Sequence, residues 1–133
     1  MAIVKTVLVN DGGAPSRIVN FTAGEALEAG EALKVNTDGT AKLATSNQAP
    51  VLGFALTDTA NGDIASVVIG RGIIINAITD AVTAGDLLSV DSAKPGFLET
   101  KTAYADGTEE DVVIAIALET NATTDSMTKV MVL

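Results

Sequence analysis

The 133-residue sequence contains no histidine, no cysteine and no tryptophan. These absences exclude Ser-His-Asp and Cys-His catalysis, Cys/His zinc sites and disulfide bonds. The longest uncharged apolar stretch, 73–78, is far below the roughly 18 residues that a membrane-spanning helix needs. The N-terminus lacks a basic region followed by a long apolar stretch, so no signal peptide is predicted. We therefore expect a protein without a membrane segment.

Positive charge is also scarce. Eight Lys and Arg residues stand against 17 Asp and Glu residues, so 8 − 17 gives a formal net charge of −9. Only two of the cations are arginines, Arg17 and Arg71. Binding of nucleic acid through its phosphates needs a basic face. The composition therefore predicts no nucleic-acid partner.

The residues that are abundant indicate β-structure. Val, Ile and Thr occur in short runs separated by Gly, Asp and Asn, which is typical of strands joined by turns. Between residues 23 and 35 the Ala, Glu and Leu content favours helix, but Gly24 and Gly30 interrupt any helix before three turns. The expected strands cover 3–9, 17–22, 32–36, 41–44, 51–56 and 64–69. The predicted fold class is all-β, a compact β-sandwich or β-barrel-like domain.

An internal repeat organises the chain. The segment 29–35 (AGEALKV) matches 84–90 (AGDLLSV) at a shift of 84 − 29 = 55, and 51–56 (VLGFAL) matches 113–118 (VIAIAL) at a shift of 113 − 51 = 62. The second shift exceeds the first by 62 − 55 = 7, so the second copy holds about seven extra residues between its matched segments. We place them around 101–111, because exposed loops tolerate insertions. We expect a single β domain over 23–133, built from two similar halves at approximately 23–72 and 79–133.

Residues 1–22 lie outside this repeat and are interpreted as an extended N-terminal arm. The arm carries more apolar residues than a free tail should, at Ile3, Val4, Val7, Leu8 and Val9. Two interpretations remain open. The arm adds a strand to its own domain, or it adds one to the sheet edge of another chain.

Few residues are candidates for chemistry. Paired carboxylates at 109–111, with Asp58 and Asp63, are the remaining acid or base groups, and acids in such loops are usually solvated. The loop 58–63 resembles a calcium loop in composition, but its register fails the EF-hand template because Thr57 falls where Asp is required. We therefore predict no catalytic residue, no metal site and no cofactor. Gly70-Arg71-Gly72 lacks the third glycine of a dinucleotide-binding motif and the Lys-Ser/Thr of a P-loop. We expect it to form a bend between strands.

The repeated module resembles the small capsid decoration (cement) proteins of tailed bacteriophages, which include a family first catalogued as a domain of unknown function. The resemblance covers roughly 23–133 and rests on the Ala-Gly-acid-x-Leu turn followed by the Val51–Leu56 strand, and on their second copies. It implies a β-rich homotrimer on the outer surface of the capsid, assembled in the host cytoplasm, that clamps neighbouring subunits of the major capsid protein.

The resemblance also assigns roles to residues. The capsid-binding arm falls on Ile3, Val4, Lys5, Val7, Leu8 and Val9. Arg71, Ile73 and Ile75 are the possible oligomer contact, and two interpretations of the apolar run 73–78 stay open, the core of the domain or the contact within the trimer. The expected partners are the major capsid protein and other copies of the chain, with no nucleic acid and no membrane.

Other classes of function stay open. A carbohydrate-binding or cell-surface-binding β-sandwich is the main alternative, although sugar sites usually use an exposed aromatic platform and only Tyr104 offers one. A tail or head-fibre component of a phage shares the same β scaffold. A small hydrolase that works through carboxylates or a bound metal is the third alternative.

Overall fold

The structure is a computed structural model of the whole chain, and it describes residues 8–10, 17–47, 49, 51–101, 112–124 and 126–133. Within these ranges there is no helix, and therefore none able to span a membrane. The strands are β1 (Leu8–Asn10), β2 (Arg17–Thr22), β3 (Ala32–Val35), β4 (Ala41–Leu43), β5 (Gly53–Ala55), β6 (Ile64–Ile69), β7 (Ile74–Thr79), β8 (Leu87–Val90), β9 (Leu98–Thr100), β10 (Ala115–Ala117) and β11 (Ser126–Val132). The predicted all-β class is confirmed.

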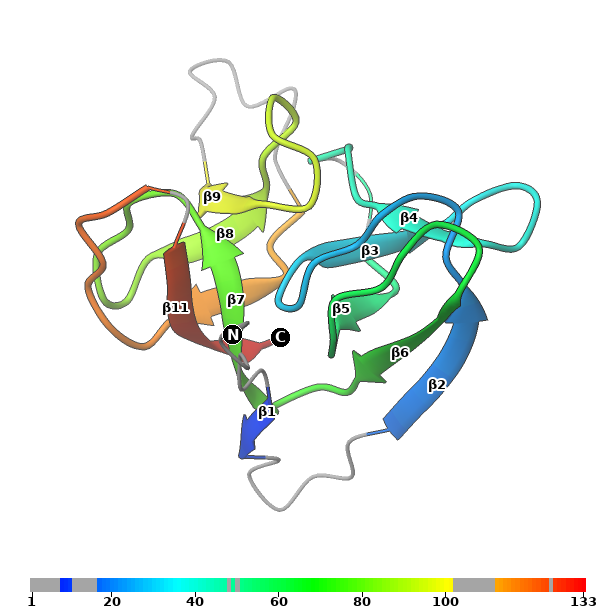
Figure 1. Cartoon of the computed structure of the whole chain (residues 1–133). Helices are drawn as coiled ribbons and strands as arrows, with labels where there is room; N and C mark the ends of the chain where they lie inside the picture. Colours follow the sequence, from blue (N-terminus) through cyan, green and yellow to red (C-terminus); the bar gives the residue numbers. More distant parts are fainter. Residues whose placement is uncertain (1–7, 11–16, 48, 50, 102–111, 125) are drawn as a thin grey trace.

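The strands form two sheets of the same design (Figure 1). The first sheet has the order β2-β6-β5-β3-β4, and the second has the order β7-β11-β10-β8-β9 with β1 added beside β7. A parallel bridge between Ala23 and Ala41 closes the first sheet. Parallel pairing of Thr79 with Leu98 closes the second. The two similar halves are thus two small barrel-like sheets.

The strand registers show which residues of the two halves are equivalent. Leu33 lies opposite Gly53, and Leu88 lies opposite Ala115. The sequence shifts of 88 − 33 = 55 and 115 − 53 = 62 therefore join residues with the same place in the fold. The seven extra residues of the second half are divided between two connections. The connection between β8 and β9 is two residues longer than the connection between β3 and β4. The connection between β9 and β10 is five residues longer than the connection between β4 and β5.

The last strand of each half follows a slightly different shift. Val68 and Met131 lie opposite the central residues of β5 and β10, so they are equivalent and their shift is 131 − 68 = 63. Across β6 and β11, Val68 pairs with Ile18 and Met131 pairs with Ile74. Strand β2 is thus equivalent to β7 at a shift of 74 − 18 = 56. Residues 17–22, which were expected in the arm, form this strand.

The segment between β2 and β3 shows why glycine prevents a helix here. Gly30 has a φ of 90°, which L side chains rarely adopt. Its N–H donates to the carbonyl of Ala55, and its own carbonyl accepts from the N–H of Ile78 in the second half. This backbone therefore links both halves, and a turn replaces the helix that its composition favours.

Two groups of buried side chains form the core. The smaller group fills the first sheet around Leu27, Leu33 and Val67. The larger group fills the second sheet and continues across the junction, where it includes Phe54 and Val68 of the first half. The halves therefore share one core.

Candidate functional site

The clearest concavity lies at the junction of the two halves. It is a pocket of about 360 Å³ whose walls come from β5 and β6 on one side and from the segments beside β10 and β11 on the other. Its apolar lining includes Val51, Phe54, Ile69, Ile114 and Leu133. Residues 51–54 of the first half and 112–114 of the second half both contribute to its walls.

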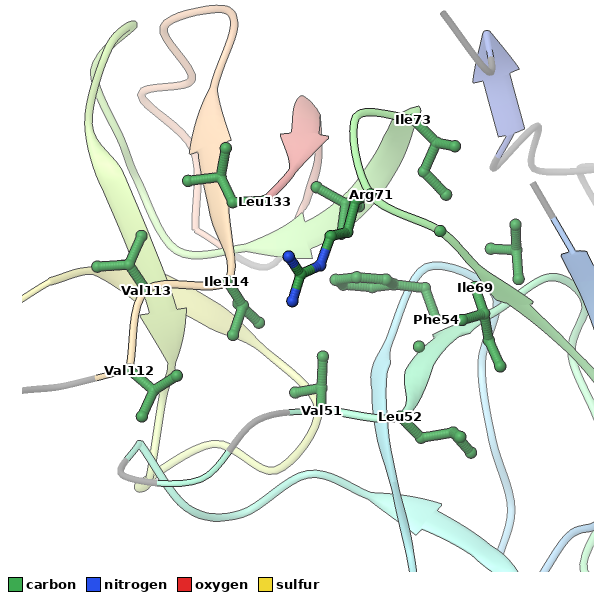
Figure 2. A pocket seen from close by; sticks show the side chains of 14 residues that line it. Val51, Leu52, Phe54, Ile69, Arg71, Ile73, Val112, Val113, Ile114 and Leu133 are labelled. Carbon is green, nitrogen blue, oxygen red and sulfur yellow. The ribbon is translucent and has the colours of Figure 1, made fainter. Parts of the chain in front are cut away.

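Arg71 is the single cationic residue in this lining. It lies between Gly70 and Gly72 in the link from β6 to β7, and Gly72 has a φ of 78°, so the predicted bend is present. Figure 2 shows the guanidinium group extending into the pocket beside Phe54 and Ile114. No hydrogen bond or ion pair joins Arg71 to any residue in the described part of the chain. The arrangement suits an apolar group that carries an anion.

The three residues of the predicted oligomer contact differ in their exposure to solvent. Arg71 is exposed, as a contact residue must be. Ile73 and Ile75 are fully buried in the shared core of a single chain. They therefore have no surface to offer to a second copy, because the 73–78 run packs inside its own fold.

The predicted capsid-binding arm is described only in part. Ile3, Val4, Lys5 and Val7 lie outside the described residues. Leu8 and Val9 belong to β1, and Leu8 pairs with Ile75 at the outer edge of β7. For these last residues, the alternative in which the arm adds a strand to its own domain is the one observed.

The predicted acid candidates do not form a site within the described chain. Asp58 and Asp63 are exposed, and Asp58 Oδ1 accepts a hydrogen bond of 2.8 Å from the N–H of Ala29. The Asp63 carbonyl accepts from the N–H of Ala23. Both residues thus support the turns that close the first sheet. The acids at 109–111 lie outside the described residues.

An acidic cluster that the sequence analysis did not identify lies where β7 meets β9. One carboxylate oxygen from each of Asp80, Asp91 and Glu99 lies within 4.8 Å of the others. Lys94 Nζ lies 2.7 Å from Asp80 Oδ1. The only sequence signal for this cluster is that the acids stand at or near strand ends, because the parallel closure of the sheet is what brings them together.

The pKa values of the two aspartates move in opposite directions. Burial raises the pKa of Asp91, and the hydrogen bond with Asp80 raises it further. Burial on its own raises the pKa of Asp80, but hydrogen bonds from Asp91 and Lys94 outweigh this effect and the result is a lowered pKa. When the pair holds one proton, the proton therefore resides on Asp91, and the Asp91 hydroxyl donates a hydrogen bond to Asp80.

Comparison with known proteins shows a likeness in fold to a phage protein. No family model matches the chain, and no curated protein matches it. Among solved structures, the chain is similar in fold to the N base of the head fibre gp8.5 of bacteriophage phi29, with a TM-score of 0.67 and 16% sequence identity. The match covers 90% of this chain and 95% of that one. At this identity the likeness concerns the fold.

Proposed function

We propose that the chain is a structural protein of a phage head, held on the outside of the capsid, where it bridges neighbouring subunits of the major capsid protein as a homotrimer. The observation that carries the proposal is the similarity in fold, over nearly the full length of both chains, to the N base of a phage head fibre. The resemblance of the repeated module to capsid decoration proteins supports the same class. The role involves no catalysis and no cofactor.

The physical character of the molecule suits this role. A cement protein needs rigidity and many shallow contacts, and an oligomer multiplies weak contacts through avidity. The shared core of the two halves supplies rigidity. The net charge of −9 helps the decorated particles to stay dispersed.

Light scattering and co-sedimentation test the proposal. The full chain and a variant that lacks residues 1–9 are measured for mass and are then mixed with expanded heads that lack this protein. We expect the full chain to be a trimer that sediments with heads, and the deletion variant to lose this binding while its circular dichroism stays that of a β protein. A monomer that stays in the supernatant contradicts the proposal.

A second candidate is the attachment base of a head fibre. The structural neighbour favours it, since that protein is itself the N base of a head fibre. The two functions differ in their effect on the head. A cement protein raises the temperature at which heads break open, because it clamps neighbouring subunits, whereas a fibre base binds without this effect.

A further inference from the structure

The two halves differ in what covers the outer edge of their first strand. In the second half, β1 pairs with β7 at Ile74 and Ile75. At the equivalent positions of β2, which are Ile18 and Val19, no strand in the described ranges pairs on the outer side. Figure 1 shows β2 at the rim of the molecule with β6 along its inner side. The position that β1 fills in one half has no counterpart in the described part of the other.

This edge is apolar and exposed. Ile18 is 55% exposed and Val19 is 37% exposed, whereas Ile75, the equivalent of Val19, is fully buried. Proteins usually protect such edges with charges, proline or short strands, because an unpaired apolar edge attracts another strand. Strand β2 is six residues long, and its single charge, on Arg17, stands at one end. It therefore has the properties of a strand that receives a partner.

The backbone of β2 alternates between β6 and the open side. The carbonyl of Ser66 on β6 accepts a hydrogen bond from the N–H of Leu56, which follows β5, so Ser66 faces β5 and the neighbouring odd-numbered residues of β6 face β2. Val19 lies opposite residue 67 and is hydrogen-bonded to β6. Ile18 and Asn20 consequently direct their N–H and C=O groups toward the open side. An added strand has these groups available for pairing.

The charges beside this edge indicate the character of the partner. Arg17 lies opposite Ile69 at one end of β2, whereas Arg71, two residues after Ile69, extends into the junction pocket on the other side of β6. Neither arginine has an ion pair or hydrogen bond with a described residue. Arg17, whose charge no described residue neutralises, favours a partner with an acidic side chain at this end of the edge.

We propose that β2 accepts an extended segment of another head protein, which carries alternating apolar side chains and at least one acidic residue, and which pairs antiparallel to β2 as β1 pairs with β7. This inference rests on the proposed function and names its contact surface. A second copy fits less well. Antiparallel pairing of two β2 strands places each Arg17 opposite an uncharged end, and it brings together two chains of net charge −9.

Four variants test this surface against expanded heads that lack the protein. Ile18→Lys places a charge on the edge, and its control is Val35→Lys on β3, where the exposed fraction is a similar 50%. Arg17→Gln removes the cation, and its control is Lys129→Gln, an exposed lysine on β11. We expect each edge variant to weaken co-sedimentation by about tenfold or more, because charges on edges block strand addition and each lost ion pair weakens binding. The two controls should bind as the wild type does, and circular dichroism melting checks that all four fold.

The outcomes separate this inference from the proposed function. A wild type that does not bind heads overturns the proposed function. A wild type and an Ile18→Lys variant that bind equally overturn this inference alone. If Ile18→Lys instead lowers the mass of the free protein in light scattering, a second copy covers the edge and the inference is wrong. Hydrogen exchange gives an independent measure, since binding should newly protect the amides of Ile18 and Asn20 while that of Val19 is already protected.

Discussion

Individual residues of this protein acquire their properties from neighbours that are distant in sequence. Asp80 and Asp91 are eleven positions apart, and the closure of β7 on β9 brings their carboxyl groups into one hydrogen-bonded pair. Ala93 donates its N–H to Asp91 Oδ1 at 2.8 Å, and Lys94 pairs with Asp80. A proton shared within this pair stabilises the folded state only over a limited range of pH.

The pair predicts a pH dependence of stability with a defined sign. The pKa of Asp91 is raised on folding, so its ionisation lowers stability as the pH rises through that raised value. The pKa of Asp80 is lowered, so its contribution is present above the ordinary aspartate value and is lost as the pH falls through the lowered one. The pair therefore contributes most stability between the two pKa values, where Asp91 is protonated and Asp80 is charged.

Substitution of Asp91→Asn tests this sign. Asparagine keeps an N–H donor toward Asp80 and an oxygen for Ala93, but it does not ionise. The stability of the variant relative to wild type should therefore increase from about pH 4, near the ordinary aspartate pKa of 3.8, to pH 7, measured by urea unfolding with circular dichroism. A difference that is the same at both pH values contradicts the assignment of the proton to Asp91.

At the scale of single elements, the pairing of β7 with β11 contains a buried polar pair that β2 and β6 lack. Thr79 and Thr128 are fully buried, and their hydroxyl oxygens lie 2.6 Å apart. Asn121 Nδ2 donates to Thr128 Oγ1 at 2.9 Å. The equivalent positions of the first half, at shifts of 56 and 63, are Ala23 and Ala65, which are also buried. The same pair of strands thus accepts either an apolar pair or a polar pair in which each partner is satisfied.

A double-mutant cycle on the two threonines measures this coupling. Valine keeps the shape of threonine and removes the hydroxyl group, so Thr128→Val should lower the free energy of unfolding by about 1–3 kcal/mol, because it leaves buried polar groups without a partner. The double substitution Thr79→Val/Thr128→Val should cost less than the sum of the single ones, by about 1 kcal/mol. Urea unfolding of the four proteins gives the coupling energy, and strictly additive losses contradict the expected interaction.

At the scale of the whole molecule, the shared core determines how the two halves behave together. Phe54 and Val68 of the first half pack in the same cluster as Ile73 and Ile114 of the second. Gly30 adds a backbone hydrogen bond from the first half to Ile78. Neither half buries its own apolar surface completely, so we expect the chain to unfold as one unit.

The substitution Phe54→Ala tests whether the two halves unfold together. Phe54 is 1% exposed, and its truncation should lower the free energy of unfolding by about 3–5 kcal/mol because it leaves a cavity at the junction. Phe97→Ala is the matched control, since Phe97 is half-buried in the β8–β9 connection and should cost less. Urea unfolding of Phe54→Ala should still be one transition, and two separate transitions would show that the halves fold independently.

The local features of this fold can be predicted from neighbouring residues alone. Strands 17–22 and 64–69 were predicted with the bounds that the structure has. The turns at the glycines and the two similar halves also follow from residue order, because strand and turn preferences act between neighbouring residues and a repeated pattern repeats them. The exclusion of Cys and His chemistry needs composition alone.

Only the tertiary structure decided which faces and edges are covered. The sequence left Ile73 and Ile75 open to either the core or an oligomer contact, and the fold buries both side chains in the core. The acidic cluster at Asp80 and the pocket beside Arg71 arise from segments that meet only when the sheets close. Strand order and sheet closure depend on contacts between distant residues, which no local pattern encodes. The edge of β2 that no described strand covers is visible for the same reason, because only the folded chain shows that β1 lies on β7.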